Sequence, residues 1–333
     1  MFTVNADSVQ RYLREKSLLS ADETVTVTEL QGGVSNTVLK VVTKDKRWVV
    51  KQALPRLKVE QEWISSVERM EREEECMEYV SGLLATGAVP LLVHRDPENH
   101  LCIMTCAPDG AANWKEMLLD GQAEPALAAQ AGSLLGTIHR LSHGDEAAVR
   151  RFGDKKFFHE LRLDPFYGRI AEVHPRQADL IGSYAAALAA SSICFVHGDY
   201  SPKNFLASRG RLILLDFEVG HIGHPAFDLG FMVAHLTLKT IKFWSRRDDY
   251  LMLITSFWNA YVPAATFESE AWHERGFLPH LGCLLLARMD GKSPVNYLPN
   301  DADRNRVRAL AASLISREIP SMRVYLDILS RAA

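Results

Sequence analysis

Two short apolar segments that each run directly into an acidic loop constrain the fold of this chain more than any other feature. Residues 193–196 (ICFV) lead into residues 197–199 (HGD), with Asn204 five positions after the aspartate. Residues 212–215 (LILL) lead into residues 216–218 (DFE). A short apolar run bounded by polar loops is typical of a buried strand. We therefore expect a metal-dependent site at the mouth of a hairpin formed by these two strands.

The polar side chains of these loops are hard oxygen donors. Carboxylate and amide oxygens are the ligands that Mg²⁺ prefers, and Asn204, Asp216 and Glu218 are the expected metal ligands. Glu218 stands two positions after Asp216, and on an extended chain such residues point to the same side. Asp199 is the candidate catalytic base, or the group that orients a hydroxyl. Phosphoryl transfer needs positioning and charge neutralisation above all, so this set of residues suits it.

The N-terminal part of the sequence has the pattern of an antiparallel meander. Residues 24–30, 37–42 and 47–52 are expected strands, separated first by the glycine-containing turn at residues 31–36 (QGGVSN). This turn is either an ordinary hairpin or a loop whose backbone N–H groups approach phosphates. Lys51 on the third strand follows an apolar run, which favours a phosphate-binding lysine over a solvated one. The turn residues expected to contact a nucleotide are Gly32, Gly33, Ser35 and Asn36.

Residues 66–85 are expected to form a helix with an apolar stripe. Met70, Met77 and Val80 recur at helical spacing, and Glu73 and Glu74 flank them. A glutamate on the inner face of this helix would hold Lys51 in an ion pair. We expect Glu73 to be that residue, with Glu74 as the alternative.

The next expected strand, residues 101–106, ends at the breaker Ala107-Pro108-Asp109-Gly110. We place the boundary between two lobes here, with residues 1–106 as a nucleotide-binding N-lobe and residues 107–333 as a C-lobe. The end of a strand at such a linker exposes backbone groups that can contact the edge of an adenine. The candidates for this contact are Met104, Thr105 and Ala107.

Beyond residue 110 the pattern is mainly helical. Residues 144–175 are mixed in charge and contain two prolines, so we expect a connecting loop or a substrate-side insertion there. His139 is expected to be a packed core residue, and His221 and His224 neutral loop histidines rather than metal ligands. The expected helices are 113–120, 124–142, 176–191, 225–239, 245–262, 270–290 and 302–331.

Length and charge exclude several classes of protein. The 333 residues are enough for two lobes. The net charge of −3 shows no basic excess of the kind that nucleic-acid binding favours. No apolar run approaches the ~18 residues of a membrane helix. The first residues lack a signal-peptide pattern and the five cysteines form no CxxC pair, so we expect a cytoplasmic protein with reduced thiols. Oligomeric state is not indicated.

The motifs around Asp199 and Asp216 resemble the aminoglycoside phosphotransferase and choline kinase group of small-molecule kinases. The match consists of residues 197–199 with Asn204, then Asp216, and the trailing Gly220, Pro225 and residues 228–230. Lys51 and residues 32–36 are similar to that family's nucleotide lysine and loop. The resemblance implies an α+β, protein-kinase-like fold with a small antiparallel-sheet N-lobe and a larger, mainly helical C-lobe. It also implies ATP, Mg²⁺ and transfer of the γ-phosphate to a substrate hydroxyl.

Carried over position by position, the resemblance makes Asp199 the catalytic base, Asn204 and Asp216 the Mg²⁺ ligands, and Lys51 the phosphate lysine. His197 then supports the catalytic loop. Asp228 is expected to brace the same loop through hydrogen bonds to its backbone.

A narrower resemblance is to methylthioribose kinases. It covers residues 50–55 (VKQALP) with the following Glu62-Trp63, and Glu218 fits the Asp-x-Glu metal motif found in these enzymes and in choline kinases. Residues 200–204 and Phe217 depart from the methylthioribose kinase pattern, so the acceptor stays open among aminoglycosides, choline-like amines, methylthioribose and other sugars.

The sequence thus predicts an ATP- and Mg²⁺-dependent kinase acting on a hydroxyl of a small molecule. One alternative is a non-catalytic ATP-binding regulator on the same fold, although such proteins usually lose the base or a metal ligand. The other is a metal-dependent hydrolase that uses the Asp/His cluster.

Overall fold

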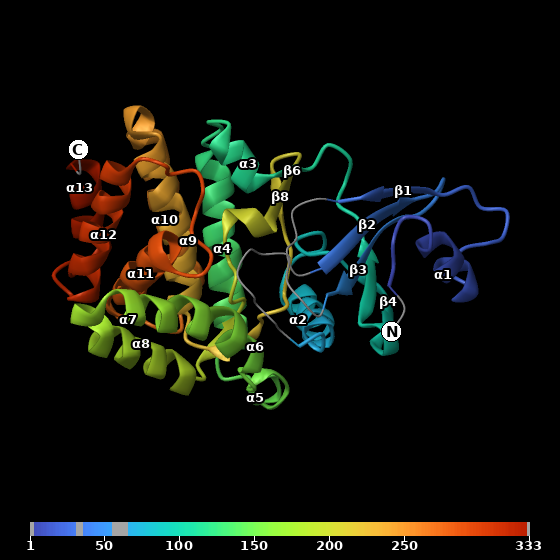
Figure 1. Ribbon diagram of the computed structural model, residues 1–333, viewed down its shortest axis with the longest axis horizontal. Helices are drawn as coiled ribbons and strands as arrows, with labels where there is room; N and C mark the ends of the chain where they lie inside the picture. Colours follow the sequence, from blue (N-terminus) through green and yellow to red (C-terminus); the bar gives the residue numbers. More distant parts are fainter. Residues whose placement is uncertain (1–2, 31–35, 55–65, 332–333) are drawn as a thin grey trace. The chain divides into compact units, whose positions relative to one another are not determined.

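The computed structural model describes residues 3–30, 36–54 and 66–331, and it divides into two compact units (Figure 1). The first unit is Met1–Asp109 and the second is Gly110–Ala333. The first holds a small antiparallel sheet and the second is mainly helical, which is the α+β architecture that the sequence predicts. Within the described ranges, no helix is both long and apolar enough to cross a membrane.

The sheet of the first unit has five antiparallel strands in the order β1-β2-β3-β5-β4. Its register places Lys51 opposite Val38 on one side and Cys102 on the other. Leu39 and Val41 are buried and alternate with half-exposed neighbours, the period-two pattern of a strand with one covered face. The strands are β1 (Thr26–Glu29), β2 (Asn36–Val42), β3 (Arg47–Ala53), β4 (Leu92–Asp96) and β5 (Leu101–Thr105).

The described part of the first unit also contains two α-helices. In α1 (Val9–Glu15), Val9 and Leu13 join the hydrophobic cluster formed by β2, β3 and β5. In α2 (Arg69–Leu83), the buried positions include both apolar residues and two glutamates. The start of α2 is fastened by Arg69, which is fully buried and donates from Nη2 to the carbonyl of Leu54 over 2.8 Å.

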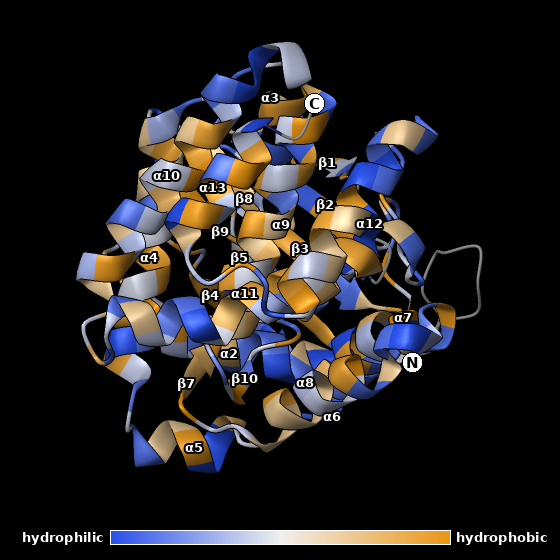
Figure 2. Cartoon of the chain, turned by 90° about the vertical axis from the view of Figure 1, so that its left-hand side faces the viewer, coloured by the Kyte–Doolittle hydropathy of each residue, from blue (hydrophilic) through white to orange (hydrophobic). Residues whose placement is uncertain are grey.

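The second unit contains most of the helices. They are α3 (Trp114–Leu119), α4 (Pro125–Ser142), α5 (Glu146–Phe152), α6 (Lys156–Phe158), α7 (Arg169–Val173), α8 (Ala178–Ala190), α9 (Ala226–Lys242), α10 (Arg247–Ala264), α11 (Glu270–Asp290), α12 (Asp301–Ile315) and α13 (Met322–Arg331). Helix α9 is buried from Ala226 to Ile241, and Figure 2 colours most of it as hydrophobic. A helix that is buried on every side belongs in the centre of a core, and α9 packs against both α10 and α11.

The contact between α4 and α10 depends on small residues. A Cβ atom at Gly132 would lie 2.1 Å from the carbonyl oxygen of Phe257, and one at Gly136 would lie 2.8 Å from that of Tyr261. Glycine at these two positions therefore lets the two helix backbones approach closely.

The strands that precede the acidic loops do not pair with each other, which corrects the expected hairpin. β7 (Cys194–Val196) pairs with β10 (His221–Gly223), whereas β9 (Arg211–Leu214) pairs with β8 (Phe205–Ser208). β8 in turn pairs with the short β6 (Ala112–Asn113). β8 and β10 are too short to show a clear periodic pattern in the sequence. Their strand conformation depends on pairing with β9 and β7, respectively.

The segment 144–175 is helical, so the expectation of a connecting loop is wrong. It contains α5, α6, a π-helical turn over His159–Gly168, and α7. Asp145 begins the segment as a helix cap, accepting hydrogen bonds from the amides of Ala147 and Ala148. Although the segment is mixed in charge, it also contributes buried aromatic side chains such as Phe158 and Phe166. The expected helix 302–331 is in fact two helices, α12 and α13, separated by a break that contains Pro320.

Candidate functional site

The loop that follows β7 is fastened to α9 by one carboxylate. Asp228 is fully buried, and its two oxygens accept hydrogen bonds from the amides of His197 (2.7 Å) and Gly198 (2.9 Å). Gly198 has φ = 75°, and a Cβ atom there would lie 2.7 Å from the side chain of Val219. Both conditions require glycine at this position. These two hydrogen bonds are the backbone contacts that the sequence led us to expect of Asp228.

His197 joins this loop to the loop after β9. Its Nδ1 accepts a hydrogen bond from the amide of Asp199 (3.2 Å), so its Nε2 is the nitrogen that donates to the carbonyl of Leu215 (3.0 Å). The ring packs against Phe217 with 4.9 Å between the ring centres. Burial lowers the pKa of His197 below its ordinary value. A neutral histidine with both nitrogens in use has a supporting role and no free atom for chemistry.

Asp199 lies at the centre of a polar cluster. Its Oδ1 is 3.0 Å from Nη2 of Arg162, and its Oδ2 accepts from Asn204 (2.8 Å) and Lys203 (3.3 Å). Burial alone would raise the pKa of Asp199, but the charges of Arg162 and Lys203 outweigh it and hold that pKa below its ordinary value. An ionised carboxylate of low pKa orients a hydroxyl well and is a weak base in the ground state.

The sequence reasoning missed Arg162 and Lys203. Arg162 lies in the segment that was expected to be a loop, 37 positions before Asp199, so only the tertiary structure reveals the pair. Lys203 stands four positions after Asp199, a spacing that could have suggested an ion pair.

Asn204 is oriented so that its amide oxygen is available. Its Nδ2 donates to the backbone oxygen (2.9 Å) and the carboxylate of Asp199, while its Oδ1 accepts no hydrogen bond from the described residues. The carbonyl of Asn204 accepts from the amide of Leu215 (2.9 Å), which links the two loops a second time. An amide oxygen presented in this way can be a ligand of a hard cation.

Asp216 and Glu218 lie close together, but not for the reason expected. Asp216 has φ = 70°, a left-handed conformation, so the chain is not extended there. A carboxylate oxygen of Asp216 and one of Glu218 nevertheless lie within 4.8 Å of each other, with the fully buried Phe217 between the two residues in the chain. Carboxylate oxygens that lie this close together are the kind of ligand that a hard cation prefers. The donor set therefore fits Mg²⁺ in chemistry.

In the first unit, Lys51 pairs with Glu73 rather than Glu74. Lys51 Nζ is 2.7 Å from Glu73 Oε1, and both side chains are buried. Glu74 faces Arg95 instead, with 3.5 Å between Oε2 and Nε, and burial raises the pKa of Glu74 to about 8. The structure thus distinguishes the two glutamates that the sequence left as alternatives.

The other residues expected to contact the nucleotide are placed as follows. Gly32, Gly33 and Ser35 lie outside the described residues. Asn36 begins β2 and is buried. Met104 and Thr105 end β5, and the side chain of Thr105 accepts a hydrogen bond from the amide of Leu91 (2.9 Å). Ala107 follows that strand and is half-buried.

Three histidines near these loops do not behave as metal ligands. His139 is fully buried and its Nδ1 is 3.1 Å from the hydroxyl of Tyr261, which confirms it as a core residue. His221 lies in the strand β10 rather than in a loop. Burial lowers the pKa of His224 to about 4, and its ring stacks on Trp272, so it is neutral as expected.

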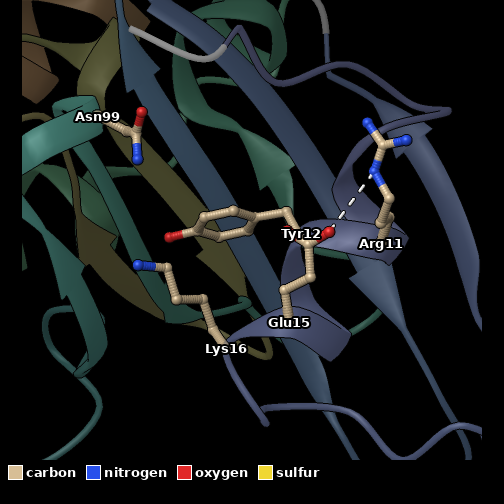
Figure 3. Close-up of a pocket in the computed structure, with 5 residues that line it drawn as sticks. All are labelled: Arg11, Tyr12, Glu15, Lys16 and Asn99. Carbon is tan, nitrogen blue, oxygen red and sulfur yellow. Dashed lines mark ion pairs between the residues drawn. The ribbon is translucent and has the colours of Figure 1, made fainter.

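A separate pocket of about 370 Å³ lies beside α1 (Figure 3). It is lined by Arg11, Tyr12, Glu15, Lys16 and Asn99. Its polar groups are satisfied by protein partners: Tyr12 donates to Asp96 over 2.7 Å, and Lys16 is 3.1 Å from the same carboxylate. None of the residues expected to form the site lines this pocket.

Comparison with known proteins supports the architecture. The model of the phosphotransferase enzyme family matches residues 26–256. A methylthioribose kinase of Exiguobacterium sibiricum is 28% identical over 313 residues, which cover 84% of this chain and 76% of that protein. A methylthioribose kinase of Pectobacterium carotovorum is 26% identical, covering 71% of this chain and 66% of that protein.

Two solved structures resemble the chain over most of its length. A choline/ethanolamine kinase family protein from Mesorhizobium loti has a TM-score of 0.52 at 17% identity, covering 97% of this chain and 99% of that one. A macrolide 2′-phosphotransferase from Brachybacterium faecium has a TM-score of 0.55 at 15% identity, covering 98% and 97%. These likenesses show the protein-kinase-like fold.

Proposed function

Because the chain belongs to the phosphotransferase enzyme family and is a small-molecule kinase, we propose that it transfers the γ-phosphate of ATP to a hydroxyl of a small molecule. The observation that carries the proposal is the state of Asp199. This carboxylate is ionised, buried and held by three donors on a loop that Asp228 fastens to the core. Catalysis of phosphoryl transfer depends on such fixed placement.

Each residue of the second unit has a distinct role in the proposal. Asp199 accepts the hydrogen bond of the substrate hydroxyl and aims its oxygen at the phosphorus. Asn204, Asp216 and Glu218 would hold Mg²⁺, which when bound neutralises charge on the phosphates. Arg162 keeps Asp199 ionised, and His197 and Asp228 maintain the geometry of the loop.

The first unit supplies the lysine. We assign Lys51 to the phosphates of ATP, with Glu73 holding its side chain by the 2.7 Å ion pair. Gly32, Gly33, Ser35 and Asn36 are proposed for the phosphate loop, and the backbone of Met104, Thr105 and Ala107 for the adenine. In these terms residues 1–106 serve the nucleotide and residues 107–333 the acceptor.

The acceptor is proposed to be a small alcohol. The relatives named methylthioribose kinase favour a sugar hydroxyl. A non-catalytic regulator is disfavoured because the base and all three oxygen ligands are present in the chain. A hydrolase that used the histidines is disfavoured because His139 is committed to the core and His224 is neutral and stacked.

The test is coupled ADP release with Mg²⁺-ATP and a panel of alcohols. Asp199→Asn should lower turnover by roughly 10²–10⁴, the usual worth of a positioned base. Asp248→Asn is the matched control because its side chain is 85% exposed, and its turnover should equal that of the wild type. A loss of less than threefold in Asp199→Asn would refute the role of Asp199.

Nucleotide binding is tested separately. Mg²⁺-ATP should raise the melting temperature of the wild type, since a ligand of the folded state stabilises it. Lys51→Ala should weaken ATP use, and unchanged ATP kinetics would remove Lys51 from the site. A protein that Mg²⁺-ATP does not stabilise at all would favour the hydrolase.

A further inference from the structure

Two cations on neighbouring helices, Lys239 of α9 and Arg288 of α11, have no carboxylate partner within residues 3–30, 36–54 and 66–331. Lys239 is 0% exposed, and its ammonium has only a 3.4 Å contact with the carbonyl of His235 and a position 5.3 Å from the centre of the Tyr297 ring. The Nε of Arg288 is shielded from solvent and makes no hydrogen bond in the described part of the chain. Burying a cation without a counter-charge is unfavourable, and burial with the charges of Lys115 and Arg288 lowers the pKa of Lys239 to about 7. An anion bound beside Lys239 would favour its charged form.

Arg288 lies near the residue that pairs with Asp199. Arg162, which pairs with Asp199, has its guanidinium 5.6 Å from the centre of the Phe166 ring, and the guanidinium of Arg288 is 6.0 Å from the same centre. The two arginines therefore share one aromatic residue. Among the described residues, Arg162 forms an ion pair with a carboxylate and Arg288 does not.

Lys239 belongs to a stripe of α9 side chains that begins beside Arg162, at Phe231. Phe231, His235 and Lys239 follow at intervals of four, so they share one face of the helix. The Phe231 ring lies 6.0 Å from the guanidinium of Arg162 and 4.9 Å from the ring of His235. Burial, with the charges of Arg288 and Lys239, keeps the pKa of His235 well below its ordinary value. His235 is thus a neutral spacer between the two ends of the stripe.

A third donor faces the same region. The hydroxyl of Tyr297 is buried and has no hydrogen-bond partner among the described residues. The loop that carries it is fixed at three points: the amide of Val295 donates to Arg288 (2.8 Å), that of Lys292 to Pro165 (3.2 Å), and Lys242 Nζ to the carbonyl of Tyr297 (3.3 Å). An ordered loop that presents an unsatisfied hydroxyl beside two basic side chains, neither of which forms an ion pair among the described residues, suits an anionic ligand.

We propose that Lys239, Arg288 and Tyr297 bind an anionic group, a carboxylate or a phosphate monoester, on the alcohol that Asp199 orients. The role of Asp199 in this inference rests on the proposed function, whereas the anion site does not. In the reaction, the hydroxyl oxygen forms a bond to the γ-phosphorus and the bond from that phosphorus to the bridging oxygen of ADP breaks. The hydroxyl proton leaves by way of Asp199 to solvent. The product then carries one more anionic group than the acceptor.

The first experiment measures binding of inorganic phosphate to the full chain by calorimetry, without nucleotide. Arg288→Met and Lys239→Met should each weaken phosphate binding by about tenfold to 100-fold, the range for losing a hydrogen bond to a charged group. Tyr297→Phe should weaken it by less. Lys46→Met is the matched control, because Lys46 already has a carboxylate partner in Glu23 at 3.0 Å and lies in the first unit. Its phosphate affinity should not change.

Melting temperature separates binding from folding. Because burial lowers the pKa of Lys239 to about 7, the cost of burying its charge is fully present only below that pH. At pH 6 and without phosphate, Lys239→Met should therefore melt at a higher temperature than the wild type, while still losing phosphate affinity. Phosphate affinity that is equal in the wild type, Arg288→Met and Lys239→Met would overturn the anion site. If Arg288→Met folds poorly, the phosphate affinities of Lys239→Met and Tyr297→Phe test the anion site in its place.

The second experiment compares acceptors in matched pairs by ADP release: ribose 5-phosphate against ribose, and gluconate against glucose. The anionic member of a pair should have a kcat/KM at least tenfold higher than the neutral member. A preference in the ribose pair would identify the bound group as a phosphate, and a preference in the glucose pair would identify it as a carboxylate. Preference for the neutral members would refute the inference. Phosphate binding that depends on Lys239 and Arg288, without turnover of any acceptor, would instead refute the proposed kinase reaction and leave the anion site standing.

Discussion

Replacing Asp228 with asparagine is the most informative perturbation of the proposed catalytic loop, residues 197–204. Asp228 is fully buried and accepts two backbone hydrogen bonds, from His197 at 2.7 Å and Gly198 at 2.9 Å. An asparagine has the same shape but only one acceptor oxygen. Its NH₂ group would face one of the two amides as donor against donor.

The expected magnitude follows from these contacts. A hydrogen bond to a charged group contributes about 1.5–3 kcal/mol, and an unsatisfied buried donor costs about 1–3 kcal/mol. We therefore expect Asp228→Asn to lower the free energy of unfolding by about 2–4 kcal/mol. The loop would also shift, and misplacement by about 1 Å can reduce turnover by roughly 10²-fold.

Two measurements check this prediction. Urea denaturation gives the free energy of unfolding, and coupled ADP release gives kcat and the KM for ATP. The KM should change little, because Asp228 orients the loop and is not assigned to the nucleotide. Asp327→Asn is the control: its side chain is 52% exposed in a surface pair with Arg331, and such pairs contribute about 1 kcal/mol or less.

The reasoning would be refuted by an Asp228→Asn protein with wild-type kcat. A variant that is destabilised but fully active would show that the two hydrogen bonds hold the fold and that the placement of Asp199 does not depend on them.

Three further predictions concern charge and packing. Burial raises the pKa of Glu74 from an ordinary 4.5 to about 8, so between these pH values the folded protein binds more protons than the unfolded protein. The free energy of unfolding measured in urea should therefore fall as the pH rises from 5 to 8. Glu74→Gln should abolish this fall. Arg162→Met removes the main charge that lowers the pKa of Asp199, so the acidic limb of the pH profile of kcat/KM should move to higher pH by about one to three pH units; an unmoved limb would contradict this. Gly132→Ala brings a Cβ atom to 2.1 Å from the backbone of α10 and should lower the melting temperature, whereas Gly182→Ala, with open space around it, should not.

The elements that could be predicted from sequence are those with a long periodic pattern. Strands β2 and β3 and helices α4 and α9 contain enough alternation or helical spacing to show their type. β8 and β10 have four and three residues, too few for a pattern, and they exist because neighbouring segments offer backbone partners. This is why the strands before the two acidic loops were wrongly expected to pair with each other.

The site divides in the same way. The proximity of Asp199 and Asn204 could be predicted because they are five positions apart in one loop, and their roles remain predictions. Arg162 was not predicted, because it reaches Asp199 only through the π-helical turn, in a segment whose mixed composition is typical of a loop. Lys239 occupies the last turn of α9, where a lysine normally stabilises the end of a helix. Its burial is a tertiary property that no local pattern contains.

The attachment of the catalytic loop to α9 has a consequence for hydrogen exchange. The amides of His197 and Gly198 donate to a carboxylate on a helix that is buried from Ala226 to Ile241. Amides in loops usually exchange through small local openings. Here, freeing these two amides leaves a fully buried carboxylate without its donors, so they should exchange more slowly than the amides of exposed loops in the second unit. The order that catalysis needs is then established once, during folding, and does not have to be recreated in each turnover.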